Sequence, residues 1–532
     1  MAQFLDIFGF LSVVLRGLAL AFEALTLGGV VFLFGISLQS ADDINMLARR
    51  WLRCAAVLLG VTQIAILCLN STILVNSTDL ALADVVGASF WIAGSLTVGG
   101  AAVVAVLAGH RWLAVVSPAP FMAILIGSVM ASHSVARLEH RLVLMAATLA
   151  HHLAGAAWIG ALPYLLMALR HAHDRSTASA ITARFSRLAI ISVSLLITAG
   201  TSLTLTYVGS VTALFETTYG IMLCAKMVLT VLVLLLGALN LKTVRAVAGG
   251  ATPSMFPLRR FAEAEVGIGF TILLAAASLT STPPATDVVA DRVSPPEIAQ
   301  RMKPQWPRLR TPAVGELSPA TPLTLPQSSG LPGSFVPGQQ LHSNTFADIA
   351  WSEYNHHWAG IVVFAIGVLA AFSRSFRWAR HWPFTFFGLA TFLLVRADSE
   401  NWPLGPRGFW ESFQVAEVAQ HRVFVLLIVA FAFFEWAVQT KRLPVNRAGL
   451  VFPLVCGVGG ALLLTHSHSL GNVKEEFLAE LSHIPLAILA VVAGWSRWLE
   501  IRLPDQRSRW FASIWPVCFV LIGSILIFYR ES

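Results

Sequence analysis

The hydrophobic positions along the chain fall in runs long enough to cross a membrane. A helix needs about 20 apolar residues to span the hydrocarbon core of a bilayer. On this basis the sequence predicts an all-α, polytopic transmembrane bundle of about fourteen spans. They are expected at roughly residues 8–38, 52–75, 86–109, 112–132, 140–169, 187–212, 217–241, 261–281, 352–373, 382–396, 415–438, 448–465, 476–496 and 510–529, of which the tenth is the shortest.

One long segment interrupts this pattern. Residues 282–350 hold 12 of the 25 prolines and are too polar to span and too proline-rich to be helical. We interpret them as a partly extended linker on the outer side of the membrane, with a small folded cap as the alternative. The predicted domains are an eight-helix membrane domain at 1–281, the linker at 282–350, and a six-helix membrane domain at 351–532.

Charged residues give the bundle an orientation. When alternate short loops are assigned to the cytoplasm, 22 Lys and Arg residues fall on the inner side and only six in outer loops and the terminal tail. This asymmetry follows the positive-inside rule and predicts that both termini and the linker lie outside the cytoplasm. The first span lacks a basic leader and a cleavage site, so we interpret it as a retained helix.

Composition supports the membrane assignment and excludes several functions. Charged residues make up 12% of the chain, about half of the usage in soluble domains. The pI of 9.6 reflects basic loops between apolar spans, so no nucleic-acid partner is expected. The five cysteines form no CxxC pair, which argues against a disulfide framework or zinc ribbon. Without a P-loop, a Ser-His-Asp set or an HExxH motif, the chain is not expected to be an enzyme or an ATP-driven pump.

Histidines concentrate on the outer half of the predicted bundle. Of 15 histidines, only His110, His171, His173 and His381 lie near inner loops. His151 and His152 stand in the apolar run "ATLAHHLAGAAWIG", and a rise of 1.5 Å per residue places His151 about 15 Å into the fifth span. Ionisable residues at such depth usually face the bundle interior and mark a pathway or a ligand.

The second half carries its own set of histidines. The motif "HHWAG", which begins at His356, repeats the His-His-x-Ala-Gly pattern of the first half. We predict a second outer-side metal or haem site that includes His421, His483 and at least one of His466 and His468, with His357 added from a fourth span. The predicted metal-site residues in both halves are His133, His151, His152, Met145, His357, His421, His466, His468 and His483.

The residue types favour copper as the ligand. Imidazole suits copper, zinc, nickel or haem iron, and a thioether adds affinity for Cu(I). Met145 lies seven residues before His152 and therefore on the same helix face. Two alternatives stay open. The histidines can hold haem b in a cytochrome-like electron-transfer protein, or they can make hydrogen bonds between helices.

Other charges lie within the predicted spans. Arg16 and Glu23 share one face of the first span, Lys226 is deep in the seventh, and Glu263 and Glu265 open the eighth. Such residues can form ion pairs between helices or a relay for protons or cations.

A series of motifs in the first half resembles the copper resistance protein D (CopD) family of bacterial inner-membrane proteins. The series runs over roughly residues 130–245. It comprises "SHS" at His133, "HHLAGAAWIGALPYLL" at 151–166, "ARFSRLAIISVSLLITAG" at 183–200 and "TTYGIMLCAKMVLTVLVLLLGALN" at 217–240. The family pattern of a histidine helix ending in Trp-x-Gly corresponds to Trp158 and Gly160, and its Tyr-Gly…Lys helix to Tyr219, Gly220 and Lys226.

The resemblance implies copper handling at the bacterial inner membrane. It implies transport of copper ions from the periplasm towards the cytoplasm, with His133 and one of His151 and His152 forming a copper site. A periplasmic copper-binding protein is an expected partner, besides the copper ion and the lipid bilayer. A scaffold for assembly of a copper enzyme is the third possibility that the sequence leaves open.

Overall fold

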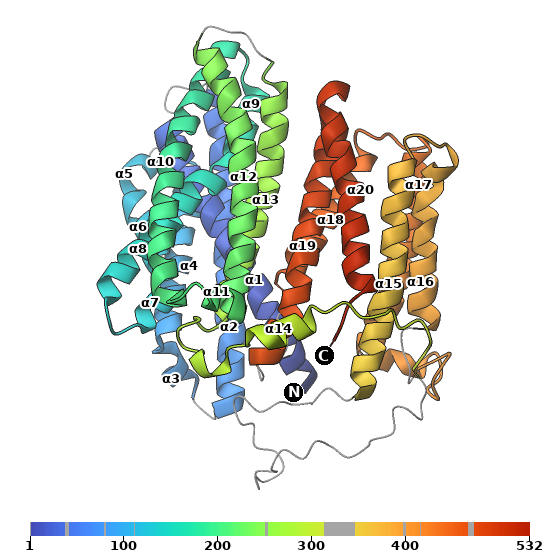
Figure 1. Ribbon diagram of the computed structural model, residues 1–532. Coiled ribbons are helices and arrows are strands. Elements are labelled where there is room, and N and C mark those ends of the chain that lie inside the picture. The colour runs from blue at the N-terminus through green and yellow to red at the C-terminus, as the bar shows by residue number, and fades with distance from the viewer. Residues whose placement is uncertain are drawn as a thin grey trace. The chain divides into compact units, whose positions relative to one another are not determined.

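The computed structural model of the 532-residue chain is shown in Figure 1. It describes residues 2–37, 42–78, 81–110, 112–249, 254–312, 346–396, 401–414, 416–465 and 473–531. Among these residues the regular elements are helices, and no β-strand is present. The prediction of an all-α protein is therefore confirmed.

Eleven helices in the described part of the chain are long and apolar enough to cross a membrane. They account for eleven of the fourteen predicted spans. The three other spans fall on shorter helices. These are α6 (Pro118–Met130), α16 (Phe386–Val395) with the 3₁₀ segment before it (Trp378–Thr385), and α18 (Val451–Leu463) with its own 3₁₀ turn (Ala448–Leu450).

The chain divides into two compact units. The first unit is formed by the described residues of Met1–Arg292, with Leu464 and Thr465. The second unit is formed by those of Val293–Leu463 and of 473–531. The domain limits expected from the sequence, 281 and 351, stay a prediction.

Eight helices of the first unit form a closed ring. In chain order they are α1 (Ala2–Val31), α2 (Asp42–Thr78), α4 (Ser89–Leu107), α6, α8 (Arg141–Gly155), α10 (Arg175–Val208), α12 (Thr218–Ala248) and α13 (Phe256–Ser281). Each packs against the next, and α13 returns to pack against α1. Helix α9 (Leu162–His171) continues the course of α8 after a π-helical turn, η2 (Ala156–Gly160), which packs on α1.

Short elements connect these helices. They are a π-helical turn after α1 (Phe32–Ile36), α3 (Leu82–Val86), α5 (Leu113–Val116), α7 (His133–Ala136) and α11 (Ala213–Glu216). Several long helices extend beyond the predicted apolar runs. For example, α10 begins at Arg175 rather than near 187 because Asp174 caps its first turn, where the carboxylate accepts a hydrogen bond from the Thr177 backbone N–H (2.6 Å).

The second unit is a smaller ring around an aromatic core. Its long helices are α15 (Phe346–Phe372), α17 (Ala416–Gln439), α19 (Val473–Arg502) and α20 (Asp505–Ile527), besides α16 and α18. Helix α20 packs against α15 and α19, α18 against α19, and α17 against α16. Trp382, Phe452 and Trp515 contact one another edge to face or tilted, with ring centroids 5.5–5.8 Å apart. Aromatic pairs in this geometry stabilise the core beyond their buried area.

The linker contains a helix, although its proline content predicted none. Helix α14 (Pro295–Arg301) begins with a capping box in which Ser294 and Glu297 satisfy each other's backbone N–H groups. The expectation of a non-helical linker was wrong here because proline is well tolerated in the first turn, where its missing N–H has no helical partner. Arg301 then anchors α14, donating hydrogen bonds to the Leu478 carbonyl oxygen (3.1 Å) and the Tyr529 hydroxyl (2.9 Å). Residues 313–345 of the linker lie outside the described part of the chain.

Candidate functional site

A glycine contact holds the histidine helix of the first unit against α1. A Cβ atom on Gly160 would overlap the Ala24 carbonyl oxygen, and one on Gly28 would overlap the Gly160 carbonyl carbon. The backbones of η2 and α1 therefore touch directly. π-Helical turns inside α-helices are frequent at functional sites, and this one directly follows the turn that carries His151 and His152.

His152 lies in a polar cluster formed by three helices. Its Nδ1 atom is 2.8 Å from the Ser128 hydroxyl on α6 and 3.5 Å from a Glu23 carboxylate oxygen on α1. The side chain of Glu23 is only 9% exposed and that of His152 is 21% exposed. We call His152, Glu23 and Ser128 the His152 cluster.

His151 points to a different part of the interior. Its Nε2 atom is 3.5 Å from the Lys226 ammonium on α12, and its ring packs on Gly200 of α10, where a Cβ atom would meet it at 3.3 Å. The buried Nδ1 atom of His151 has no hydrogen-bond partner in the described structure. The two adjacent histidines therefore contact different side chains.

His133 occupies the short helix α7, outside the apolar run of α6. Its ring meets Tyr207 edge to face, with centroids 6.3 Å apart, and its buried Nε2 atom lacks a partner among the described residues. Burial lowers the pKa of His133, and the positive charges of Arg16 and Arg137 act in the same direction. The backbone carbonyl of Leu279 and the charge of Asp287 oppose this shift only in part.

Helix α10 places His133 about two turns away from His151. Its Tyr207 contacts His133 and its Gly200 contacts His151, and these two residues are seven positions, or about 10 Å, apart. Nitrogens that share one metal ion lie within about 4 Å of each other, since each bond is about 2 Å long. The contacts on α10 to His133 and to His151 are thus separated by more than that distance.

Met145 is half-buried on α8. Its spacing from His152 is retained because both residues belong to one helix. The geometry thus brings Ser128 and Glu23 to His152, and Ser128 was not singled out from the sequence because a serine in an apolar run carries no distinctive pattern.

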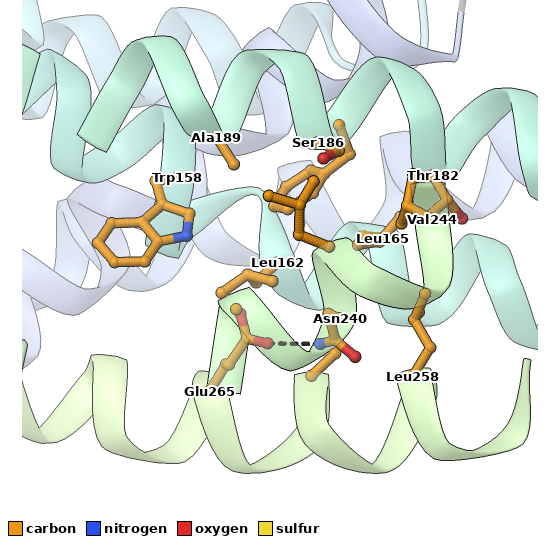
Figure 2. A pocket seen from close by; sticks show the side chains of 14 residues that line it. Trp158, Leu162, Leu165, Thr182, Ser186, Ala189, Asn240, Val244, Leu258 and Glu265 are labelled. Carbon is orange, nitrogen blue, oxygen red and sulfur yellow. Dashed lines mark hydrogen bonds between the residues drawn. The ribbon is translucent and has the colours of Figure 1, made fainter. Parts of the chain in front are cut away.

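The first unit also contains a small cavity between α9, α10, α12 and α13, near the helix ends joined by residues 249–255. Its volume is about 70 Å³. Figure 2 shows Asn240 of α12 and Glu265 of α13 joined by a hydrogen bond of 2.5 Å at its wall, with Ser186 and Thr182 of α10 across from them. Nearby, Glu263 is paired with Arg170 and Arg260, so part of the charge within the spans forms ion pairs between helices.

In the second unit, His357 is fully buried and uses both ring nitrogens. The Arg308 backbone N–H donates to Nδ1 (2.7 Å), and Nε2 donates to the Tyr529 carbonyl oxygen (2.8 Å). Metal ligation by His357 would therefore cost one of these hydrogen bonds. The structure instead brings the neighbouring His356 to His483, with ring centroids 6.3 Å apart.

The remaining histidines of the predicted second site are less defined. His421 is half-buried on α17, which packs mainly against α16, whereas His483 lies on α19. His466 and His468 lie outside the described residues. Throughout the described ranges, no group of three or more His, Cys, Asp or Glu residues is arranged to hold a metal ion. The predicted ligand sets stay predictions.

Comparison with known families identifies one segment. Residues 179–279 match the family model of copper resistance protein D (CopD). This segment covers most of α10, all of α12 and most of α13, and it includes every residue that lines the cavity except Trp158, Leu162 and Leu165. No curated protein and no solved structure matches the chain. The resemblance inferred from the motifs is confirmed, although the histidines at 133, 151 and 152 precede the matched segment. The chain is a multi-pass membrane protein that carries a copper resistance protein D (CopD) family domain at residues 179–279.

Proposed function

We propose that the first unit transports copper ions across the bacterial inner membrane, from the periplasm towards the cytoplasm. His133 would receive the ion near the outer surface, and the His152 cluster would bind it about two helical turns deeper. His151 lies beside this path, and Met145 offers a thioether on the same helix. The CopD-family domain supports a role in copper resistance or uptake, and the polar positions inside the ring of helices support transport.

The environment of His152 carries this proposal. A metal-binding imidazole commonly donates its second ring N–H to a carboxylate, which fixes the tautomer and leaves the other nitrogen to bind the metal. Glu23 and Ser128 are placed to hold Nδ1 in this way. The same carboxylate balances the charge of a cation held in an environment of low dielectric constant. A histidine that served only to link helices would not need a buried carboxylate beside it.

The membrane topology is part of the same proposal. Fourteen spans, eight and six, with both termini and the linker in the periplasm account for the distribution of basic residues. The domain limits are those expected from the sequence, 1–281, 282–350 and 351–532. A periplasmic copper-binding protein would deliver the ion to the outer end near His133.

Copper uptake into proteoliposomes tests the role of the His152 cluster. His152→Ala removes the ligand and is expected to abolish saturable uptake. Glu23→Gln keeps the size of the side chain but removes its charge, and loss of such a supporting group typically weakens metal binding about 10- to 100-fold. We therefore expect a rise of that order in the copper concentration that gives half-maximal uptake.

His171→Gln is the matched control. His171 lies at the end of α9 and its Nδ1 is hydrogen-bonded to the Met167 carbonyl oxygen (2.9 Å), away from the proposed path. This variant should transport copper like the unmodified protein. Unchanged uptake by well-folded His152→Ala and Glu23→Gln variants would refute the proposal.

One observation supports the second candidate, a b-type cytochrome. His356 and His483 each place Nδ1 2.7 Å from the carbonyl oxygen four residues earlier, so Nδ1 carries the proton and Nε2 keeps its lone pair. Two such imidazoles from α15 and α19 can ligate haem iron. The absorption spectrum of the purified protein separates the two candidates, because bound haem gives a Soret band and copper transport requires none.

A further inference from the structure

The cavity in the first unit differs chemically from the histidine positions. Its polar lining consists of the Glu265 carboxylate, the Asn240 amide, and the hydroxyls of Thr182 and Ser186. Trp158 contributes an indole N–H, which can only donate. The lining has neither the imidazole nor the sulfur ligands that copper prefers, so the cavity suits a harder ion.

Asn240 leaves an acceptor oxygen without a partner. Its Nδ2 group donates to Glu265, whereas its buried Oδ1 atom has no hydrogen-bond partner in the described residues. A buried polar atom of this kind is rare in folded proteins, and a bound water molecule or ion commonly satisfies it. Thr182 donates its hydroxyl proton to the Ala178 carbonyl oxygen (2.7 Å), so only its lone pairs remain for a ligand.

Glu265 also lacks a positive partner. The residue is 3% exposed, and the described part of the chain offers it no ion pair. Glu263, two positions earlier on the same helix, shows the contrast, since Arg170 and Arg260 both pair with it. A buried carboxylate without a counter-charge is costly, and a bound cation removes that cost.

We propose that this cavity binds one sodium ion through Glu265, Asn240 and the hydroxyls of α10. Hard cations prefer oxygen ligands from carboxylates, amides and hydroxyls, which are the groups present. A single carboxylate balances a single positive charge, so a monovalent ion fits better than a divalent one. The volume of about 70 Å³ has room for the ion with one or more water molecules. The ligands come from α10, α12 and α13, so occupancy links these three helices.

Binding of radiolabelled sodium to the purified full-length protein in detergent tests this site directly. The unmodified protein should bind sodium saturably with about one ion per chain, and unlabelled sodium should compete better than potassium or choline at equal ionic strength. Absence of saturable sodium binding would overturn the proposal without reference to any variant.

Variants then locate the site. Glu265→Gln keeps the shape of the side chain but removes its charge and should weaken sodium binding about tenfold or more, because affinity depends on ligand charge. Asn240→Leu should weaken binding as well, since it removes the acceptor oxygen. Glu263→Gln is the same chemical change outside the cavity and should leave sodium affinity unchanged. Equal sodium binding by the Glu265→Gln and Glu263→Gln proteins would overturn the assignment.

This test is independent of the copper proposal. Sodium binding is measured without copper, and copper uptake can be measured with choline in place of sodium. A negative result in the sodium-binding experiment therefore leaves the copper proposal untouched, and a negative copper-uptake result leaves the sodium site untouched.

Discussion

Neighbouring side chains of the same type differ in this protein in the partners of their ring nitrogens or carboxylate oxygens. His357 and His356 are adjacent. Both ring nitrogens of His357 are hydrogen-bonded to backbone groups, whereas His356 uses Nδ1 in this way and lies beside His483. Glu263 and Glu265 differ in the same way, one paired with arginines and the other facing a cavity. The sequence places all four within or at the ends of predicted spans, but it does not distinguish the members of each pair, because most of their partners come from other segments of the chain.

One prediction at the residue scale concerns Asp174, which lies in the loop before α10. Hydrogen bonds from Ser176 and Thr177 lower its pKa from 3.8 to about 2. A carboxyl group with a lowered pKa in the folded state stabilises the fold at pH values above its unfolded pKa. The contribution is therefore complete above about pH 4 and is lost as the pH falls through 3.8 towards 2.

Amide hydrogen exchange in the first turn of α10, corrected for the intrinsic rate, measures this loss. Protection should fall between pH 4 and pH 2 in the unmodified protein. Asp174→Asn keeps a good N-cap but does not titrate, so its protection should not change with pH in this way. An identical pH profile for both proteins would contradict the prediction.

At the scale of helices, the sequence predicts where helices occur better than it predicts how they pack against one another. Every predicted span coincides with a helix, because a long apolar run has few other stable structures in a membrane. The sequence did not predict the π-helical turn η2 or the helix α14. Both depend on particular contacts, namely the backbone contact between Gly160 and α1 and the anchoring of Arg301 by Tyr529. Such contacts join residues far apart in the chain, and apolar periodicity contains no information about them.

The contact between η2 and α1 gives a prediction for Gly160→Ala. The added Cβ atom would overlap the Ala24 carbonyl oxygen, and backbone cannot move aside as a flexible side chain can. Overpacking of this kind typically costs about 1–3 kcal/mol. The variant should unfold at a lower temperature in detergent and lose copper uptake, because α1 carries Glu23.

Gly99→Ala on α4 is the matched control for this helix contact. No atom lies within 4 Å of a Cβ built there, and the residue is exposed. Alanine in a helix should then raise stability by about 0.5–1 kcal/mol relative to glycine. If both variants unfolded at the same temperature as the unmodified protein, the direct contact between η2 and α1 would be disproved.

At the scale of the whole chain, the CopD-family segment covers only the last third of the first unit. It covers α12 and most of α10 and α13, three of the helices that line the cavity, while the proposed copper path uses α1, α6, α7 and α8, which precede it. The basic asymmetry from which the orientation of the spans is inferred is a property of the full sequence, and it requires no knowledge of contacts between helices. The sequence does not predict which helices are neighbours, because that depends on how the ring closes between α13 and α1.

The topology makes opposite predictions for two loops, and cysteine labelling in intact cells tests both. In a protein whose five cysteines are replaced by alanine, Ser328→Cys in the linker should react with a membrane-impermeant maleimide added from outside. His173→Cys, in the exposed turn between α9 and α10, should react only after permeabilisation, because that turn belongs to the arginine-rich side. One missed or extra span between the two positions would place both on the same side of the membrane. Labelling of both cysteines from outside, or of His173→Cys alone, would therefore exclude the orientation on which inward copper transport depends.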